Sequence, residues 1–383
     1  MDGIGGSSLG EAKAHALAAQ EQQVETLTAF KIVSGADWGG VPEGHRAAFD
    51  AGARPPWPGP SAAPDLAARW NALGRSAAGG GITPLPGVDH RQRAQGPRFS
   101  NSGTLGVGRS RWETSPNWAG AVLPAGENER FSAVTARWRV PNAVEAPSGP
   151  PAIAGADPSD PLSRRCSVWI GLDGHRMIAG SLPQIGTTTA EIFPVEGRRV
   201  DAYAWAQWWV RGQQYGEMVF SKFLVQPGDE VTCWLAMHDE ERVVMCIRNH
   251  RTGQEDGVRW RSGPAVDAIT AGTDYLRKTA QLHRGPAPVQ GQAAVWIVER
   301  PTVMGSDNQY PLPALEPVAF ADCIAGVRGP GQPFHEVANL RNLGGSRMLR
   351  MVAQSTAPWH ARRIATPAPM GIDRTQLLVS CCG

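Results

Sequence analysis

Two carboxylic acids stand where this sequence could do chemistry. Glu299 ends a strongly apolar run in which Val295, Ile297 and Glu299 alternate onto one face of a predicted strand. A poorly solvated carboxyl there would hold its proton more tightly and serve as a general acid or base. It could instead reach water at the strand end and pair with Arg300. Asp173 is the second candidate, although Asp173 followed by glycine is also an ordinary turn signal.

An aromatic strand is the second feature that indicates a site. Over residues 202–210, one predicted face carries Tyr203, Trp205, Gln207 and Trp209, and the other face is mostly alanine. The alanine face suits close packing of one sheet on another. The aromatic face, with its polar amide, suits a binding groove, although the same rings could simply fill a large core.

The elements that position these residues are predicted to be strands. Beyond about Trp112, short runs rich in Val, Ile, Thr and Trp recur between turn residues, which favours one all-β domain, a β-sandwich or a barrel, over residues 111–383. Residues 1–110 differ. They are expected to hold a helix over Leu9–Phe30 and then a Gly/Pro-rich arm, whose Trp38, Trp57 and Trp70 could dock on the sandwich.

Composition excludes several function classes. The chain has 383 residues and a formal net charge of +2, so it has no global field that would attract nucleic acid or an anionic membrane. The 45 Gly and 32 Pro disfavour a helical bundle.

We find no signal peptide and no apolar run long enough to span a membrane. The 6 cysteines lack metal-ligand spacing; a Cys233–Cys246 bridge is conceivable, but reduced thiols are expected.

Several short segments together resemble the glutamic peptidases, or eqolisins. They occur in the family's order over about residues 112–325, and no single one is specific alone. The segments are Asn117-Trp-Ala-Gly120, Trp169-Ile-Gly-Leu-Asp-Gly174, Leu182-Pro-Gln-Ile-Gly186, Ala204-Trp-Ala-Gln-Trp-Trp209, Pro227-Gly-Asp229, Asn249 with Thr252-Gly253, Trp296-Ile-Val-Glu299 and Pro317-Val-Ala-Phe-Ala-Asp322.

The resemblance implies a two-sheet antiparallel β-sandwich, a concanavalin-like jelly roll, that hydrolyses peptide bonds with a Glu and a Gln. By position these are Glu299, which would activate a water and later protonate the leaving amine, and Gln184, which would stabilise the oxyanion. No metal or cofactor is expected. The side chains implied to bind substrate or support the site are Trp118, Trp169, Asp173, Trp205, Gln207 and Trp209.

The sequence also departs from the family. Tyr203 and Gln207 stand where the family carries Asp and Glu, so two carboxylates near the groove are missing. Well-known members are secreted, acidic proteins with a propeptide, which would make residues 1–110 a prosegment and the activity acidic. We expect a monomer with a polypeptide substrate and no nucleic-acid or membrane partner. Two alternatives remain: a peptide- or carbohydrate-binding module without catalysis, and a glycoside hydrolase, for which Asp173 would be the only acidic partner of Glu299.

Overall fold

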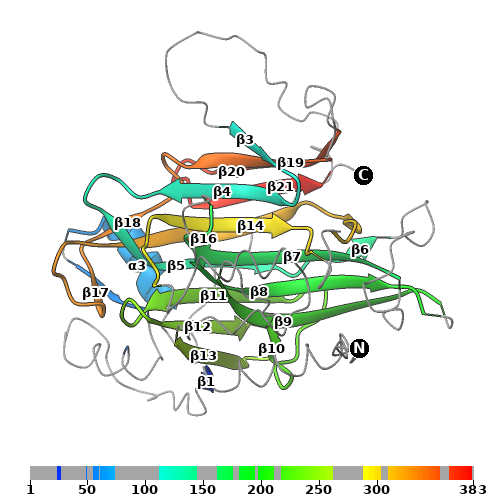
Figure 1. Ribbon diagram of the computed structural model, residues 1–383, viewed down its shortest axis with the longest axis horizontal. Helices are drawn as coiled ribbons and strands as arrows, with labels where there is room; N and C mark the ends of the chain where they lie inside the picture. Colours follow the sequence, from blue (N-terminus) through cyan, green and yellow to red (C-terminus); the bar gives the residue numbers. More distant parts are fainter. Residues whose placement is uncertain are drawn as a thin grey trace, which may run out of the picture.

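The computed structural model is almost entirely β-strand (Figure 1). It describes residues 24–26, 49, 55–59, 61–73, 112–144, 162–175, 181–194, 197–210, 217–261, 288–302, 309–353 and 362–381. The elements before the sandwich are β1 (Val24–Thr26), β2 (Trp57–Pro58) and α3 (Pro64–Leu73). The sandwich comprises β3 (Trp112–Ser115), β4 (Trp118–Pro124), β5 (Arg130–Arg139), β6 (Ala143–Val144), β7 (Ser163–Leu172), β8 (Ser181–Ile192), β9 (Arg199–Val210), β10 (Met218–Val219), β11 (Glu230–Met237), β12 (Arg242–Asn249), β13 (Glu255–Arg261), β14 (Ala293–Glu299), β15 (Ala314–Leu315), β16 (Val318–Arg328), β17 (Glu336–Val337), β18 (Asn339–Arg341), β19 (Arg347–Val352), β20 (Arg363–Met370) and β21 (Gln376–Cys381).

Two antiparallel layers form the sandwich. The layer that we call the site sheet has the order β10–β9–β8–β7–β14–β4–β19. The layer that we call the back sheet has the order β1–β13–β12–β11–β5–β16, with β18 and β21 paired to different parts of β16. The predicted all-β sandwich is confirmed.

The two layers join along one side. From the site sheet, β4 pairs with β19, β19 with β20, β20 with β21, and β21 with β16 of the back sheet. Strand β3 adds to β19 in parallel. Figure 1 shows these last strands and β3 gathered beyond β14 and β16. We call this set, β3, β19, β20 and β21, the seam.

The alternation of side chains predicted for residues 202–210 and 295–299 is confirmed in β9 and β14. Small and branched side chains of β9 and β14, with Trp208 and Trp296, enter the core between the layers. Two indole N–H groups in this core are paired: Trp138 Nε1 donates to Thr187 Oγ1 at 3.0 Å, and Trp296 Nε1 donates to the Thr135 carbonyl at 2.9 Å. The opposite face of the site sheet carries Trp169, Trp205, Leu182, Val295 and Ile297, with Trp118, Tyr203 and Trp209 against them.

Part of the arm covers the outer face of the back sheet. Helix α3 begins at Pro64, which suits a first helical position, and it buries Leu66 and Trp70 one turn apart. Trp70 is 1% exposed and donates its indole N–H to the Pro56 carbonyl at 2.7 Å. These side chains pack on Trp234, Val244 and Ile324, which face away from the central core.

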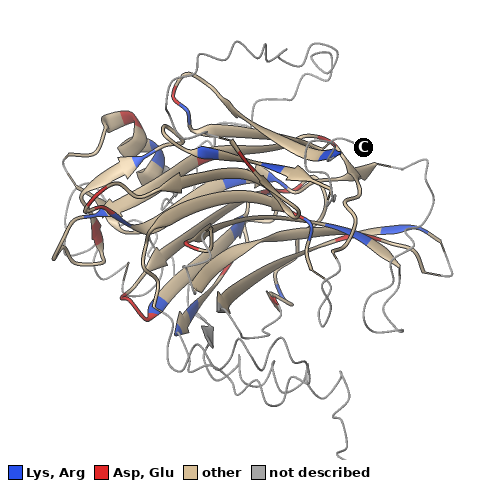
Figure 2. Cartoon of the chain, turned by 45° about the horizontal axis from the view of Figure 1, so that its top comes forward, with Lys and Arg blue, Asp and Glu red and all other residues tan. Residues whose placement is uncertain are grey.

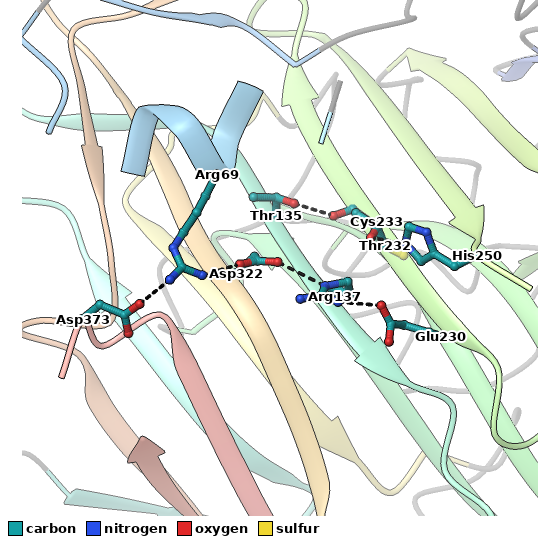
Figure 3. A network of polar contacts seen from close by, with 9 residues as sticks. All are labelled: Arg69, Thr135, Arg137, Glu230, Thr232, Cys233, His250, Asp322 and Asp373. Carbon is teal, nitrogen blue, oxygen red and sulfur yellow. Dashed lines mark hydrogen bonds and ion pairs between the residues drawn. The ribbon is translucent and has the colours of Figure 1, made fainter. Parts of the chain in front are cut away.

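A polar network fixes the same helix (Figure 3). Arg69 donates to Asp322 at 3.0 Å and to Asp373 at 2.7 Å. Asp322 also accepts from Arg137 at 3.1 Å, and Arg137 reaches Glu230 at 2.6 Å. The described part of the arm therefore braces the back sheet, on the side of the sandwich opposite Trp169.

The structure corrects part of what the sequence predicted for the N-terminal arm. Most of the helix predicted over Leu9–Phe30 lies outside the described residues, and its residues 24–26 form strand β1 instead, paired with β13. Helix α3 was not predicted, because the Gly/Pro content around it hid its apolar spacing. Trp38 also lies outside the described residues, whereas Trp70 docks as expected.

The conceivable disulfide bridge does not form. Cys233 lies opposite Ile247 and Cys246 lies opposite Trp234, so the two thiols are one register step apart. They also point to opposite faces of the back sheet, Cys233 into the central core and Cys246 toward the arm. Cys233, Cys166 and Cys323 are buried free thiols.

Charge and hydropathy agree with the composition. Figure 2 shows blue and red segments interspersed over the described chain. Among the described residues, no helix is long and apolar enough to cross a membrane. Within the same ranges, no cluster of three or more His, Cys, Asp or Glu side chains could hold a metal ion.

Candidate active site

Glu299 ends β14 in a row of side chains that crosses the site sheet. The register places it between Trp118 of β4 and Ser167 of β7, and the row continues through Thr188 of β8 to Tyr203 of β9. Side chains directly opposite one another in such a row lie within contact distance. We call this the carboxyl row.

Two side chains hold the Glu299 carboxylate. Trp169 donates its indole N–H to Oε2 at 2.7 Å, and Asn117 donates its amide N–H to Oε1 at 3.1 Å. Asn117 is itself fixed, because Ser115 Oγ donates to its Oδ1 at 3.1 Å. The carboxylate is therefore oriented by one group from the neighbouring strand β7 and one from the turn between β3 and β4. Asn117 belongs to one of the motifs of the sequence, but its role as this donor was not predicted.

Burial raises the pKa of Glu299 to about 7. The nearby Glu217 carboxyl contributes to this rise in pKa, while Trp118, Trp169 and Asn117 oppose it. The Trp118 indole N–H is buried and faces the carboxylate without reaching hydrogen-bonding geometry. This environment fits the acid/base interpretation of Glu299.

The alternative, an ion pair of Glu299 with Arg300, is not what the structure shows. Arg300 donates its Nε–H to the Tyr310 carbonyl at 3.0 Å. Its backbone N–H donates to the Asn117 carbonyl at 2.9 Å, which holds the strand end against the turn that carries Asn117. Arg300 thus holds the end of β14, and the Glu299 carboxylate is bound by the neutral donors Trp169 and Asn117.

Gln184 lies within β8, in a second row that crosses the same face. It stands opposite Gly171 of β7 and Gln207 of β9. Its amide N–H donates to Gln207 Oε1 at 2.6 Å, and its own Oε1 is buried and has no hydrogen-bond partner. We call this the amide row. A buried acceptor without a donor is costly, so it is suited to bind a water or an N–H that enters the site.

The register separates the two rows by four residues. Gly171 lies opposite Val295 on β14, which is about 13 Å along the strand from Glu299 at 3.3 Å per residue. Trp169 fills the interval, because its ring bonds Glu299 at one end, and its Cζ3 would be 3.2 Å from a Cβ on Gly171 at the other. Both side chains project from one face, with Trp169 between them.

Two glycines leave room for Trp169. A Cβ on Gly186 would be 2.3 Å from the Val168 carbonyl and 2.5 Å from Trp169 Cβ. A Cβ on Gly171 would be 2.9 Å from the Pro183 carbonyl, which is the close backbone approach expected for a glycine within a strand. A side chain at either glycine would collide with Trp169 or with the neighbouring backbone, so both glycines are needed for Trp169 to lie between the two rows.

The other predicted residues divide into two groups. Trp118, Trp169, Trp205 and Trp209 gather with Gln207 on the face that carries Glu299 and Gln184. Asp173 does not join them: it lies at the other end of β14, where its backbone N–H donates to the Ala293 carbonyl. Its carboxylate accepts three backbone N–H groups, from residues 290, 291 and 292, at 2.6 to 3.0 Å.

Sequence reasoning missed Glu217. This residue directly precedes β10, and it accepts a hydrogen bond from the Tyr203 hydroxyl at 3.0 Å. Burial raises its pKa to about 7. Nothing in the strand alternation links residue 217 to residue 299, because Glu217 lies outside every strand that the sequence predicted around the site.

The sequence comparison decides the family. The model of the Peptidase A4 family matches residues 116–343, more than half of the chain and both rows of the site. The chain belongs to the Peptidase A4 family. It is a glutamic peptidase, a hydrolase that acts on peptide bonds. None of the curated proteins compared matches the chain.

Solved structures of eqolisins resemble this Peptidase A4 member. Scytalido-glutamic peptidase with a transition-state analogue inhibitor has 17% sequence identity, covers 70% of this chain and 100% of its own, and gives a TM-score of 0.46. SCP-B, in a complex with the tripeptide Ala-Ile-His, has 14% identity, the same coverage and a TM-score of 0.44. Aspergilloglutamic peptidase from Aspergillus niger has 16% identity, covers 57% of this chain and 99% of its own, and gives a TM-score of 0.37.

Proposed function

We propose that this peptidase works through Glu299 and Gln184. Glu299 removes a proton from the attacking water and returns it to the leaving amine, while Gln184 binds the oxyanion or the water through its amide. The observation that carries the proposal is the Glu299 carboxyl, held by Trp169 and Asn117 on the aromatic face that also presents Gln184.

The amide of Gln184 has the capacity for this role. One of its two N–H groups is bound to Gln207, which fixes the plane of the amide and leaves the second N–H for a ligand. Its buried Oε1 accepts a water O–H at no loss of an existing bond. The rows are about 13 Å apart along the backbone, with Trp169 between them, so the proposal requires the Glu299 and Gln184 side chains to meet one substrate carbonyl above the Trp169 ring.

The working pH remains a prediction. The resemblance predicts hydrolysis at acidic pH. The pKa of Glu299, about 7, favours a different range, because a carboxyl that keeps its proton up to neutrality acts as a base only near or above that pH. A bound substrate or water that donates to the carboxylate would lower this pKa and bring the activity into the acid range.

The test is hydrolysis of a denatured protein by the purified full-length chain and by the chain after any self-processing, from about pH 3 to about pH 8. The variants are Glu299→Gln and Gln184→Leu. Glu241→Gln is the matched control, because Glu241 is a surface carboxylate in the turn between β11 and β12.

We expect Glu299→Gln to abolish cleavage and Gln184→Leu to lower kcat by about 10²–10³, as for other losses of an oxyanion donor. Glu241→Gln should cleave like the wild type. Cleavage by Glu299→Gln at the wild-type rate would refute the assignment, and so would a full-length and processed protein that cleave nothing at any pH.

One observation favours glycoside hydrolysis as a second candidate function: Glu217 supplies a second carboxyl near Glu299. The Peptidase A4 match favours peptide bonds. Assay of the same preparations on polysaccharides separates the two activities. Binding of peptides or glycans without turnover, in the wild type and in Glu299→Gln alike, would instead support the binding-module alternative.

A further inference from the structure

Glu217 enters the site from a short edge strand. Strand β10 pairs with β9 so that Val219 lies opposite Trp205 and Met218 lies opposite Ala206. Met218 packs against the central core, so its neighbour Glu217 points to the other side of the sheet, toward the carboxyl row. The Tyr203 hydroxyl, which donates to Glu217 Oε2 at 3.0 Å, fixes the side chain there.

Tyr203 and Glu299 lie in one row of mostly polar side chains, the carboxyl row. Tyr203 lies opposite Thr188, whose hydroxyl also bonds Ser167 at 2.7 Å. Ser167 lies opposite Glu299. Trp205 donates its indole N–H to the same Thr188 hydroxyl at 2.9 Å and so holds it in place. Glu217 and Glu299 thus face a common polar strip, and their charges act directly on one another.

The charged and titratable groups that face this strip come from three strands. Glu299 lies on β14, Tyr203 on β9, and Arg165 on β7. Arg165 stacks on the Tyr310 ring, with its Cζ 4.3 Å from the ring centroid, and its charge favours the ionised forms of Glu217 and Tyr203 at longer range. The Cys166 thiol lies behind the strip in the central core, where burial raises its pKa.

We propose that Glu217 is a positioning residue of this active site: held by Tyr203 on the face that carries Glu299, its carboxylate repels the negative charge of Glu299 and thereby sets the pH at which Glu299 becomes a base. The inference rests on the proposed role of Glu299. Two carboxyls that face one strip do not ionise independently, so their first proton leaves readily and the second is retained to higher pH. Glu217 also restores a carboxylate to a site in which Tyr203 and Gln207 replace the acidic residues of the family pattern.

The test follows Glu299 through Trp169, whose indole N–H bonds it directly. Full-length protein labelled with ¹⁵N-tryptophan is titrated by NMR, and the Trp169 indole signal is assigned with Trp169→Phe. The variants are Glu217→Gln, Tyr203→Phe and the control Glu241→Gln. We expect the midpoint of the Trp169 titration to fall by about one pH unit in Glu217→Gln, because the like charge is gone.

Tyr203→Phe removes only a hydroxyl, and it keeps the inference testable if Glu217→Gln folds poorly. Without that donor, Glu217 holds its proton more tightly, so Glu299 ionises at lower pH and the midpoint falls here as well. The acid limb of kcat/KM should move with the midpoint in both variants, and Glu241→Gln should match the wild type.

The outcomes separate this inference from the proposed function. An unchanged midpoint in Glu217→Gln and Tyr203→Phe overturns the inference, even if the protein cleaves peptides through Glu299. A shifted midpoint in a protein that cleaves nothing supports the influence of Glu217 on Glu299 and refutes only the proposed catalysis. A uniform loss of kcat with no change of pH profile or midpoint would also overturn the inference, because it shows a purely structural role.

Discussion

Replacing Glu299 by glutamine should stabilise the protein at high pH and leave it much less changed at low pH. Burial and the neighbouring Glu217 raise the pKa of this carboxyl from 4.5 to about 7. A raised pKa means that the folded state favours the protonated form. The protonated Glu299 carboxyl therefore contributes fully to stability below its pKa in the unfolded chain. This contribution is lost as the pH rises through its pKa in the folded protein.

The magnitude follows from the same values. One pKa unit corresponds to about 1.4 kcal/mol, so ionised Glu299 lowers the free energy of unfolding by at most about 3 kcal/mol above pH 7. The residue is partly exposed, and the remaining hydration of the carboxylate reduces this figure. Near pH 4, Glu299→Gln replaces one carboxyl oxygen that accepts from Trp169 or Asn117, and this loss lowers the free energy of unfolding by about 1 kcal/mol.

The assay is denaturant unfolding of wild type and Glu299→Gln at several values from about pH 4 to about pH 8, with Glu241→Gln as control. We expect the wild type to lose stability relative to Glu299→Gln as the pH rises, and the control to stay parallel to the wild type. Parallel stability curves for wild type and Glu299→Gln across the range would refute the reasoning, because they would mean that Glu299 has an ordinary pKa in the folded protein.

Three further predictions concern other parts of the molecule. Trp70→Ala should cost about 3–5 kcal/mol in denaturant unfolding, because it empties a site that is 1% exposed between α3 and the back sheet. Asp173→Asn should cost about 1–3 kcal/mol with kcat unchanged, because three backbone N–H groups lose a charged acceptor far from Glu299. Gln207→Leu should lower kcat more than it changes KM, because Gln184 loses the acceptor that orients its amide.

Each of these has an outcome that would contradict it. Wild-type stability of Trp70→Ala would show that α3 does not brace the sandwich in solution. A large fall in kcat for Asp173→Asn at full stability would place Asp173 in the catalytic machinery. An unchanged kcat for Gln207→Leu would separate the Gln207 contact from the function of Gln184.

The sandwich and the composition of its faces could be predicted because strand periodicity is a local property. Every second residue of a strand points to the same side, so the face with Trp205 and Gln207 and the face with Glu299 followed from the alternation alone. That the two faces belong to one sheet was supplied by the resemblance. The contacts between strands, such as Trp169 to Glu299, depend on register and side-chain reach, and no local pattern encodes them.

Two residues show where local patterns fail. Asp173 carries the turn signal that the sequence displays, and the structure uses it to bind backbone N–H groups, away from the two rows. Glu217 carries no signal at all, because its position depends on the short pairing of β10 with β9 and on the Tyr203 hydroxyl. Helix α3 was hidden by the averaging of composition over the Gly/Pro-rich arm that surrounds it.

The seam has a consequence for the order of folding. It brings β3, at residues 112–115, against β19, at residues 348–351, so its contacts span more than two hundred positions of the chain. Such pairings require the closure of a very long loop, which makes them slow to form. Until β19, β20 and β21 are in place, the outer edges of β4 and β16 lack hydrogen-bond partners over these pairings and can bind another unfolded strand. Aggregation during refolding should therefore originate at this side of the sandwich, and it should be most severe when the chain is interrupted before residue 347.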